Sequence, residues 1–210
     1  MAELKQNHSL LIRLGLSSDN HAISPLIIFS SLSPHGDLRY AATLFFTLTD
    51  PDTFLFNTLI RAFSLSQTPS ISFLFYSDML YRALSPNNFT FPSLIKSSSP
   101  SAIIHHGRQV HAHVLKFGFG SDVYALNALA HMYVIFGLLG DARKVFDRMP
   151  VRIVVSWTIM ISGYAQWGLW MRLSLFSSSC HKRIMLLGML SLRLSLATID
   201  FERLLVCFIG

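Results

Sequence analysis

The sequence has few cysteines, few charges and no long apolar run, and each shortage excludes a class of protein. Its two cysteines, Cys180 and Cys207, form no Cys-x-x-Cys pair and no cluster with histidines at metal-binding spacing. We therefore expect neither a disulfide framework nor a zinc site, and we predict no cofactor and no metal. The longest apolar stretch, near residues 184–192, is flanked by Arg183 and Arg193. It falls short of the roughly 18–20 residues that span a bilayer, so no membrane segment is expected.

Only 13% of the residues are charged, and the formal net charge of +6 is shared equally by residues 1–170 and 171–210. This mild positive bias is compatible with a polyanionic partner such as RNA, but spacing alone does not gather the charges in one groove. Lys5 and Arg13 are the only Lys or Arg residues before Asp19. No Arg-rich, acid-poor transit peptide is therefore expected at the N-terminus.

What the sequence does have is a short apolar block that recurs. Its copies start at Asn57, Pro92, Asn127 and Thr158, which are 35, 35 and 31 residues apart. A second apolar block keeps a similar period, with copies that start at Ala41, Ser72, Gly107 and Ala142. Periods of this size are typical of solenoid proteins, in which each repeat has an apolar face that only its neighbours can bury.

The apolar residues have helical rather than strand spacing. One stripe, at i, i+3, i+4 and i+7, consists of Ala142, Val145, Phe146 and Met149. Residues that stop helices, mainly Pro, Gly and Ser, gather in turns at 33–36, 67–70, 97–101 and 137–140. We therefore predict an all-α fold, an α-solenoid of stacked antiparallel helix hairpins with about four repeats.

The repeat extends to the N-terminus, because residues 5–19 align without a gap on residues 108–122. This alignment predicts that the first residues form the second helix of a unit. The predicted division is a partial unit at 1–19, complete units at 20–52, 53–87, 88–122 and 123–153, and a partial unit at 154–170.

The repeat pattern stops after Trp170. A further unit would continue with an acidic helix start of the Asp-Glu-Ala kind, but the sequence reads Met171-Arg172-Leu173. Codons for these residues, read in a neighbouring frame, can spell Asp-Glu-Ala. We hypothesise that the chain is truncated and that the non-repeat tail 171–210 is translated out of frame. The alternative is a divergent C-terminal helix that caps the solenoid.

The blocks and their spacing resemble the plant pentatricopeptide repeat (PPR) family, in the PLS subclass whose units alternate in length. The resemblance covers about residues 4–170 and is carried by residues 54–63, 107–118, 141–150, 154–158 and 161–164. It implies a partial L-type repeat at 1–19, S-type repeats at 20–52 and 123–153, a P-type repeat at 53–87, an L-type repeat at 88–122 and a partial P-type repeat at 154–170. A tetratricopeptide array has a period of about 34, so the alternation of 31 with 35 favours the PPR family.

Members of that family bind single-stranded RNA in mitochondria or chloroplasts, and the subclass is associated with C-to-U RNA editing. The resemblance implies that the fifth and last residues of each unit together read one unpaired base. It assigns Asn57 with Asn87 to a pyrimidine, with cytidine preferred. It assigns Ser24 with Asp52 to a purine.

Three further candidates occupy the same positions in other units, namely Asn127, Asp122 and Thr158. Asn127 is paired with Ile153, and Asp122 with Pro92, and neither partner offers a side-chain polar group to a base edge. Thr158 is a purine-type fifth residue whose partner is lost with the tail. We therefore expect about three bases at most to be read, and weak binding, since each contributes ~1–3 kcal/mol.

The same residues have structural alternatives. Asn57, Asn127 and Ser24 lie near predicted helix starts, where Asn and Ser are favoured caps, and Asp52 and Asp122 suit the dipole at a helix N-terminus. Five aromatic residues are candidates to stack on bases, namely Phe54, Phe56, Phe89, Phe91 and Trp157. Their recurring position at the start of the first helix favours a place in the core between repeats instead.

The predicted function is site recognition of single-stranded RNA for C-to-U editing, without enzymatic activity. A zinc deaminase needs a His-x-Glu and a Cys-x-x-Cys, and the sequence has neither. The expected partners are RNA and proteins of an editing complex, and the expected location is the mitochondrion or chloroplast, by resemblance alone. The alternatives are a helical scaffold that binds proteins and a truncated product without function.

Overall fold

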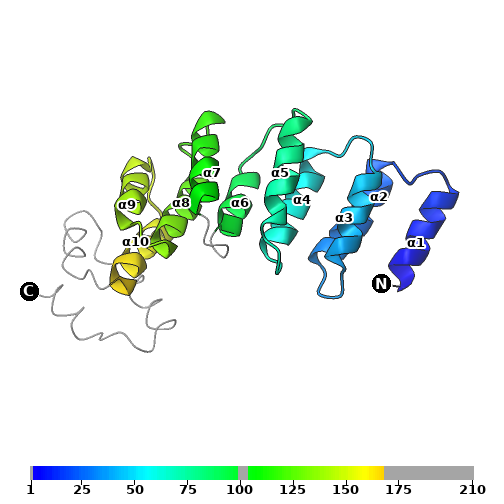
Figure 1. Ribbon diagram of the computed structural model, residues 1–210, viewed down its shortest axis with the longest axis horizontal. Helices are drawn as coiled ribbons and strands as arrows, with labels where there is room; N and C mark the ends of the chain where they lie inside the picture. Colours follow the sequence, from blue (N-terminus) through cyan, green and yellow to red (C-terminus); the bar gives the residue numbers. More distant parts are fainter. Residues whose placement is uncertain (1, 99–103, 168–210) are drawn as a thin grey trace, which may run out of the picture. The chain divides into compact units, whose positions relative to one another are not determined.

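The computed structural model describes residues 2–98 and 104–167, and these residues form helices and turns without a strand (Figure 1). The helices are α1 (Ala2–Arg13), α2 (Asn20–Leu32), α3 (Leu38–Thr47), α4 (Thr53–Ser64), α5 (Ile71–Tyr81), α6 (Thr90–Ser98), α7 (Ile104–Lys116), α8 (Val123–Ile135), α9 (Leu139–Arg148) and α10 (Val154–Gln166). They pack in sequential pairs, which confirms the all-α class and the helix hairpins. The predicted tail 171–210 lies outside the described residues.

The chain divides into two compact units, residues 1–106 and 107–210. In the first unit α2 packs on α3 and α4 packs on α5, and the first helices of successive hairpins also pack on each other, α2 on α4 and α4 on α6. In the second unit α8 packs on both α9 and α10. Each unit therefore has a layer of first helices, and these helices carry most of the predicted reading residues.

Aspartates start several of these helices. In each case a side-chain oxygen accepts a hydrogen bond from a backbone N–H of the first turn, which has no partner within the helix. The bonds are Asp19 to Ala22 (2.9 Å), Asp37 to Arg39 (2.9 Å), Asp52 to Leu55 (2.9 Å) and Asp122 to Ala125 (2.8 Å). The same geometry is also electrostatically favourable, since a carboxylate complements the positive end of the helix dipole.

The C-terminal ends of α1 and α7 have the same local geometry. Each helix is followed by a glycine with positive φ, Gly15 at 72° and Gly118 at 83°. The next N–H then bonds a carbonyl five residues back, Leu16 to Leu11 and Phe119 to Val114, both at 2.9 Å. Only glycine adopts this conformation without steric cost, so the alignment of 5–19 with 108–122 pairs two glycines for the same backbone reason.

Aromatic side chains fill the core of the first unit. The Phe45 ring lies 4.8 Å from Phe56 and 5.4 Å from Phe75, and Phe75 lies 5.2 Å from Phe63, so α3, α4 and α5 share one cluster. In the second unit Phe146 of α9 meets Trp157 of α10 at 4.9 Å. The stripe predicted for α9 is buried, which confirms its helical spacing.

Close contact between α8 and α10 requires a glycine at position 163. A Cβ added to Gly163 would lie 2.7 and 2.8 Å from the two methyl carbons of Val134, whereas one added to Gly140 would meet nothing within 4 Å. We predict that Gly163→Ala lowers the free energy of unfolding by about 1–3 kcal/mol, because the helices must separate. Gly140→Ala, the matched control in α9, should be neutral or mildly stabilising. Urea titrations of both variants test this; equal stability would contradict the close packing.

A second prediction concerns His111, whose Nδ1 lies 2.9 Å from the Tyr133 hydroxyl. Burial, and to a lesser extent Arg148, lower the pKa of His111 below its ordinary 6.5, and Asp141 opposes them. The folded state therefore favours neutral His111 more than the unfolded state does. Its contribution to stability is present above pH 6.5 and is lost as the pH falls below it.

The free energy of unfolding should therefore fall more in the natural chain than in His111→Gln between about pH 7.5 and about pH 5.5. Groups that titrate independently of His111 affect both proteins equally, so the difference isolates this residue. Denaturant titrations at the two pH values measure it. Parallel pH profiles would show that the lowered pKa is wrong.

Candidate nucleic-acid interface

The four candidate fifth residues lie inside helices, one turn past the N-terminus. They are Ser24 in α2, Asn57 in α4, Asn127 in α8 and Thr158 in α10. None is a cap, so the capping alternative is wrong for Ser24, Asn57 and Asn127, the residues for which it was raised. The Thr158 hydroxyl donates to the Val154 carbonyl at 2.9 Å, and the Ser24 hydroxyl donates to the Asn20 carbonyl, so both hydroxyl protons are used within their own helices.

The last residues behave differently, because two of them do cap helices. Asp52 precedes α4 and Asp122 precedes α8, and each accepts the backbone hydrogen bond described above. Both therefore have the structural position at a helix N-terminus that the dipole alternative gave them, and their side chains also cap the helix. Ser24 and Asp52, the predicted purine pair, share no hydrogen bond in the described structure.

Asn57 and Asn87, the predicted pyrimidine pair, are in direct contact. Asn57 Nδ2 donates to Asn87 Oδ1 at 3.0 Å, although 30 residues separate them. Both side chains are partly exposed. Asn87 lies in the connection that leads into α6, and the packing of α6 on α4 brings it beside Asn57. The amides therefore form one polar unit that water or a ligand can reach.

A third residue, Thr90, completes this polar unit and was not predicted as a site residue. Its hydroxyl donates to Asn57 Oδ1 at 2.7 Å and accepts from the backbone N–H of Asn87 at 3.0 Å. The backbone N–H of Phe89 donates to Asn87 Oδ1, also at 3.0 Å. Thr90 is fully buried. The sequence did carry a signal, since a hydroxyl three residues after a unit's last residue recurs as Ser156 after Ile153.

The equivalent positions in the second unit do not form such a cluster. Asn127 is only 6% exposed, and its Oδ1 finds no hydrogen-bond partner among the described residues. Ser156 accepts from the backbone N–H of Ile153 at 3.2 Å, as Thr90 does from Asn87. The Ile153 side chain has no polar atom that could bond the Asn127 amide, so it cannot supply the hydrogen bond that Asn127 Oδ1 lacks.

The aromatic residues divide into two groups. Phe56, Phe91 and Trp157 are buried, which confirms the predicted core. Phe54 and Phe89 are 58% and 70% exposed, so the same prediction was wrong for them. Each precedes a buried aromatic by two residues. In α4 two residues turn the helix by about 200°, so Phe54 and Phe56 lie on opposite sides, and Phe89 lies in the turn directly before α6.

Tyr124, at the start of α8, continues this exposed series at 70% exposure. It follows Phe89 by 35 residues, as Phe89 follows Phe54, and this spacing was available in the sequence. An exposed ring three residues before a fifth residue lies on the same helix face. Aromatic rings in this setting are platforms on which unpaired bases can stack.

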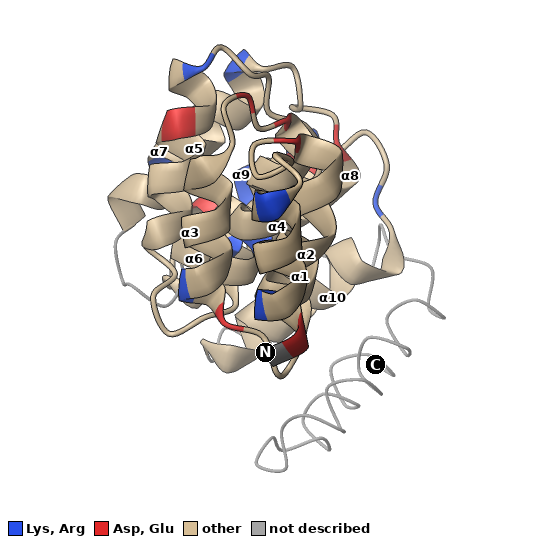
Figure 2. Cartoon of the chain, turned by 90° about the vertical axis from the view of Figure 1, so that its right-hand side faces the viewer, with Lys and Arg blue, Asp and Glu red and all other residues tan. Residues whose placement is uncertain are grey.

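Charged side chains are sparse, and most of the ribbon in Figure 2 carries neither sign. Arg61 on α4 and Lys96 on α6 follow the fifth residues Asn57 and Pro92 by four positions, which places them on the same helix face. Both are exposed, and neither forms an ion pair within the described residues. Two cations are thus available beside the candidate reading residues of the first unit.

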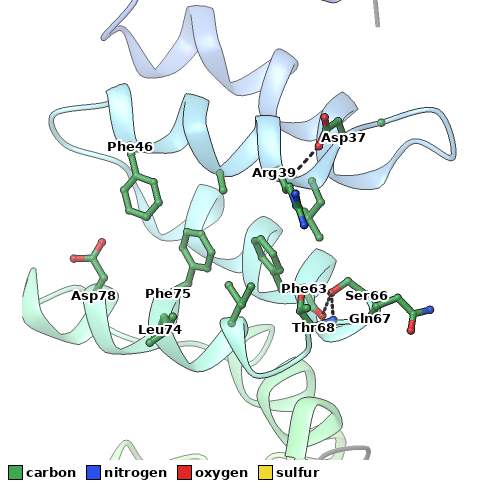
Figure 3. A pocket seen from close by; sticks show the side chains of 14 residues that line it. Asp37, Arg39, Phe46, Phe63, Ser66, Gln67, Thr68, Leu74, Phe75 and Asp78 are labelled. Atoms are coloured by element: carbon green, nitrogen blue, oxygen red, sulfur yellow. Dashed lines mark hydrogen bonds between the residues drawn. The ribbon is translucent and has the colours of Figure 1, made fainter.

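A separate groove of about 980 Å³ lies between α3, α5 and the turn that joins α4 to α5 (Figure 3). Phe46, Phe63, Leu74 and Phe75 give it an apolar lining, and Asp37 and Asp78 stand at its edges. Phe46 and Leu74 are 67% and 69% exposed. None of the candidate reading residues lines this groove.

Within residues 2–98 and 104–167, no three His, Cys, Asp or Glu side chains lie together as a metal site. No helix in this part of the chain is long and apolar enough to cross a membrane.

Successive hairpins with polar and aromatic residues at equivalent places define a helical-repeat protein with a periodic surface. The sequence profile of the PPR repeat matches residues 124–152 and 155–172. The chain is 42% identical over 157 residues to the pentatricopeptide repeat-containing protein At1g08070, chloroplastic, of Arabidopsis thaliana, an alignment that covers 74% of this chain and 21% of that protein. It is 40% identical over 162 residues to At5g06540 (75% and 26%) and 34% identical over 165 residues to At1g26900, mitochondrial (78% and 28%), from the same plant.

The chain is therefore a PPR repeat protein, homologous to these Arabidopsis proteins. It spans about a quarter of the length of these relatives. PPR proteins are generally non-catalytic, RNA-binding proteins of organelles.

A stability prediction follows from the missing cap at position 153. Ile153 occupies the N-cap of α10, where its hydrocarbon side chain offers no acceptor to the first turn. We predict that Ile153→Asp raises the free energy of unfolding by about 1 kcal/mol. Val151→Asp adds the same charge at an exposed site outside the helix and should have little effect. Equal stabilisation by both variants, in denaturant titrations, would attribute the gain to charge rather than to capping.

Proposed function

We propose that this chain binds single-stranded RNA and reads unpaired bases through the fifth and last residues of its repeats. The observation that carries the proposal is the hydrogen-bonded pair of Asn57 and Asn87, two amides at the predicted reading positions that contact each other at 3.0 Å. Residues 30 apart in sequence would not be expected to form a solvent-accessible amide pair for stability alone, since water can satisfy both amides equally well.

The surroundings of the pair suit a nucleotide. Phe54 and Phe89 offer exposed rings for base stacking, and Arg61 offers a positive charge for the phosphate backbone. Partly exposed amides supply hydrogen-bond donors and acceptors for a pyrimidine edge. One stacked, edge-read base is therefore the ligand that this part of α4 and α6 fits.

The proposal extends to the other candidate residues, whose proposed contributions to base reading differ. Ser24, Asp52, Asp122 and Thr158 are proposed to read bases with whatever hydrogen-bonding capacity their helices leave free. Asn127 is proposed to discriminate poorly, because Ile153 is apolar. We further propose that the chain belongs to the PLS subclass and has the repeat division given above. Its proposed role is to recognise C-to-U editing sites together with editing-complex proteins. The proposed location is a mitochondrion or chloroplast, the organelles for which two of the relatives are named.

The groove between α3 and α5 favours a second candidate function, a scaffold for a protein partner. Its exposed Phe46 and Leu74 would be covered by the apolar face of an amphipathic helix. The two functions use different residues, so one set of variants separates them.

The test is binding of the full chain to short unstructured RNAs that differ at one base, measured by fluorescence anisotropy. We expect affinity to fall steeply with salt, and Asn57→Ala or Asn87→Ala to reduce the preference for cytidine by about 5- to 10-fold, since each amide contributes roughly 1 kcal/mol. Leu74→Glu, in the groove, should leave RNA binding unchanged. RNA binding that is insensitive to both amides but lost in Leu74→Glu would contradict the proposal.

A further inference from the structure

The atoms of the Asn57, Asn87 and Thr90 cluster can be assigned from backbone groups that only donate. The backbone N–H of Phe89 points at the Asn87 side chain at 3.0 Å, so the atom that it meets must be the oxygen, Oδ1. The Asn57 atom 3.0 Å from that oxygen must then be the nitrogen, Nδ2. The far atom of the Asn57 amide is therefore Oδ1, and it faces Thr90 at 2.7 Å.

The hydroxyl of Thr90 has one proton, and its direction is also determined. The backbone N–H of Asn87 donates to Thr90 Oγ1 at 3.0 Å, so the hydroxyl accepts there and its proton is free for another group. Asn57 Oδ1 is nearer than Asn87 Oδ1, at 2.7 Å against 3.2 Å. Both lone pairs of Asn87 Oδ1 are already engaged by Phe89 and Asn57, so the proton goes to Asn57.

This arrangement leaves more donors than acceptors without a partner. Both N–H groups of Asn87 Nδ2 and the second N–H of Asn57 Nδ2 have no partner among the described residues, whereas Asn87 Oδ1 has both lone pairs engaged and Asn57 Oδ1 has one of its two engaged. If Asn57 flipped, its oxygen would face Asn87 Oδ1, and two acceptors would repel each other. Thr90 stabilises the unflipped amide, because its proton bonds an oxygen better than an NH₂ group.

A donor-rich edge discriminates between the two pyrimidines. Cytidine presents adjacent acceptors, O2 and N3, on its Watson–Crick edge, whereas uridine carries an N–H donor at N3. Donors of the protein would bond cytidine N3 and would oppose the uridine N3–H. When the wrong base is bound, a protein donor that faces the base is left without an acceptor, and the cost of this unpaired donor lowers the affinity for that base strongly.

We propose that Thr90 is a positioning residue that fixes the orientation of the Asn57 and Asn87 amides and thereby selects cytidine over uridine. This inference rests on the proposed RNA binding. Thr90 is buried and acts through the amides rather than by touching a base. The Asn127 site has a hydroxyl at the same spacing, Ser156, but lacks the second amide, so we expect no such selection there.

The experiment compares Thr90→Val, which keeps the shape and removes the hydroxyl, with Thr90→Ser, which keeps the hydroxyl. The matched control is Thr58→Val, because the Thr58 hydroxyl donates to the Phe54 carbonyl in its own helix, at 2.9 Å, and has no bond to either amide in the part of the chain that the structure describes. The full chain of each variant is titrated with short RNAs that carry cytidine or uridine at one position. Thr90→Val should reduce the cytidine-to-uridine affinity ratio about 3- to 10-fold, the effect of one hydrogen bond, and the other two variants should keep it.

An NMR spectrum of the side-chain NH₂ groups of the free protein gives a second readout, and this measurement needs no RNA. Thr90→Val should shift or broaden the Asn57 NH₂ signals, and Thr90→Ser should not. An unchanged affinity ratio and unchanged Asn57 signals in Thr90→Val would overturn the inference. Failure of the natural chain to bind any of the RNAs would instead overturn the proposed function, while a response of the Asn57 signals would still support the positioning role of Thr90.

Discussion

Packing of the first helices of neighbouring hairpins against one another is the constraint on which the described surface depends. A single hairpin cannot bury both sides of its first helix, so α4 needs α2 and α6, and α8 needs α10. Leu59, Ile60 and Met160 are fully buried in this way. Because the contact repeats within each unit, the second residues Phe54, Phe89 and Tyr124 are exposed, and the fifth residue Asn57 is partly exposed, whereas the fifth residue Asn127 is buried. The periodic surface is therefore a consequence of burial and does not need a separate explanation.

The last residue of each predicted unit contributes to stability and, in the proposed function, also to recognition of a base. Asp52 and Asp122 use a side-chain oxygen to cap the following helix, so these carboxylates are partly committed before any ligand arrives. Asn87 bonds a backbone N–H in the same region and also the Asn57 amide. A residue that fixes the start of the next helix is held rigidly, and a rigid donor or acceptor loses little entropy on binding. Ile153 can do neither task, so α10 has no side-chain cap and Asn127 Oδ1 has no hydrogen-bond partner among the described residues.

The fold could be predicted because period and apolar spacing are properties of the sequence itself. The contact between Asn57 and Asn87 was predictable only as a pairing of positions, and its geometry depends on how α6 packs against α4. The misplaced Phe54 and Phe89 show that helical rotation must be applied residue by residue, since neighbours of buried aromatics two positions away face solvent. The role of Thr90 could have been predicted from its spacing to Asn87. The groove at Phe46 and Leu74 could not have been predicted from the sequence, because its shape depends on the separation of two helices and on a turn between them.

The central claim is that Asn57 and Asn87 contact an RNA base, and chemical-shift mapping tests it most directly. The side-chain NH₂ signals of the full chain are followed while a short cytidine-containing single-stranded RNA is added. The account predicts that the signals of Asn57 and Asn87 shift together and saturate at one affinity, while those of Asn127 shift less. Shifts confined to residues around Phe46 and Leu74, or no shift of either amide at saturating RNA, would contradict it.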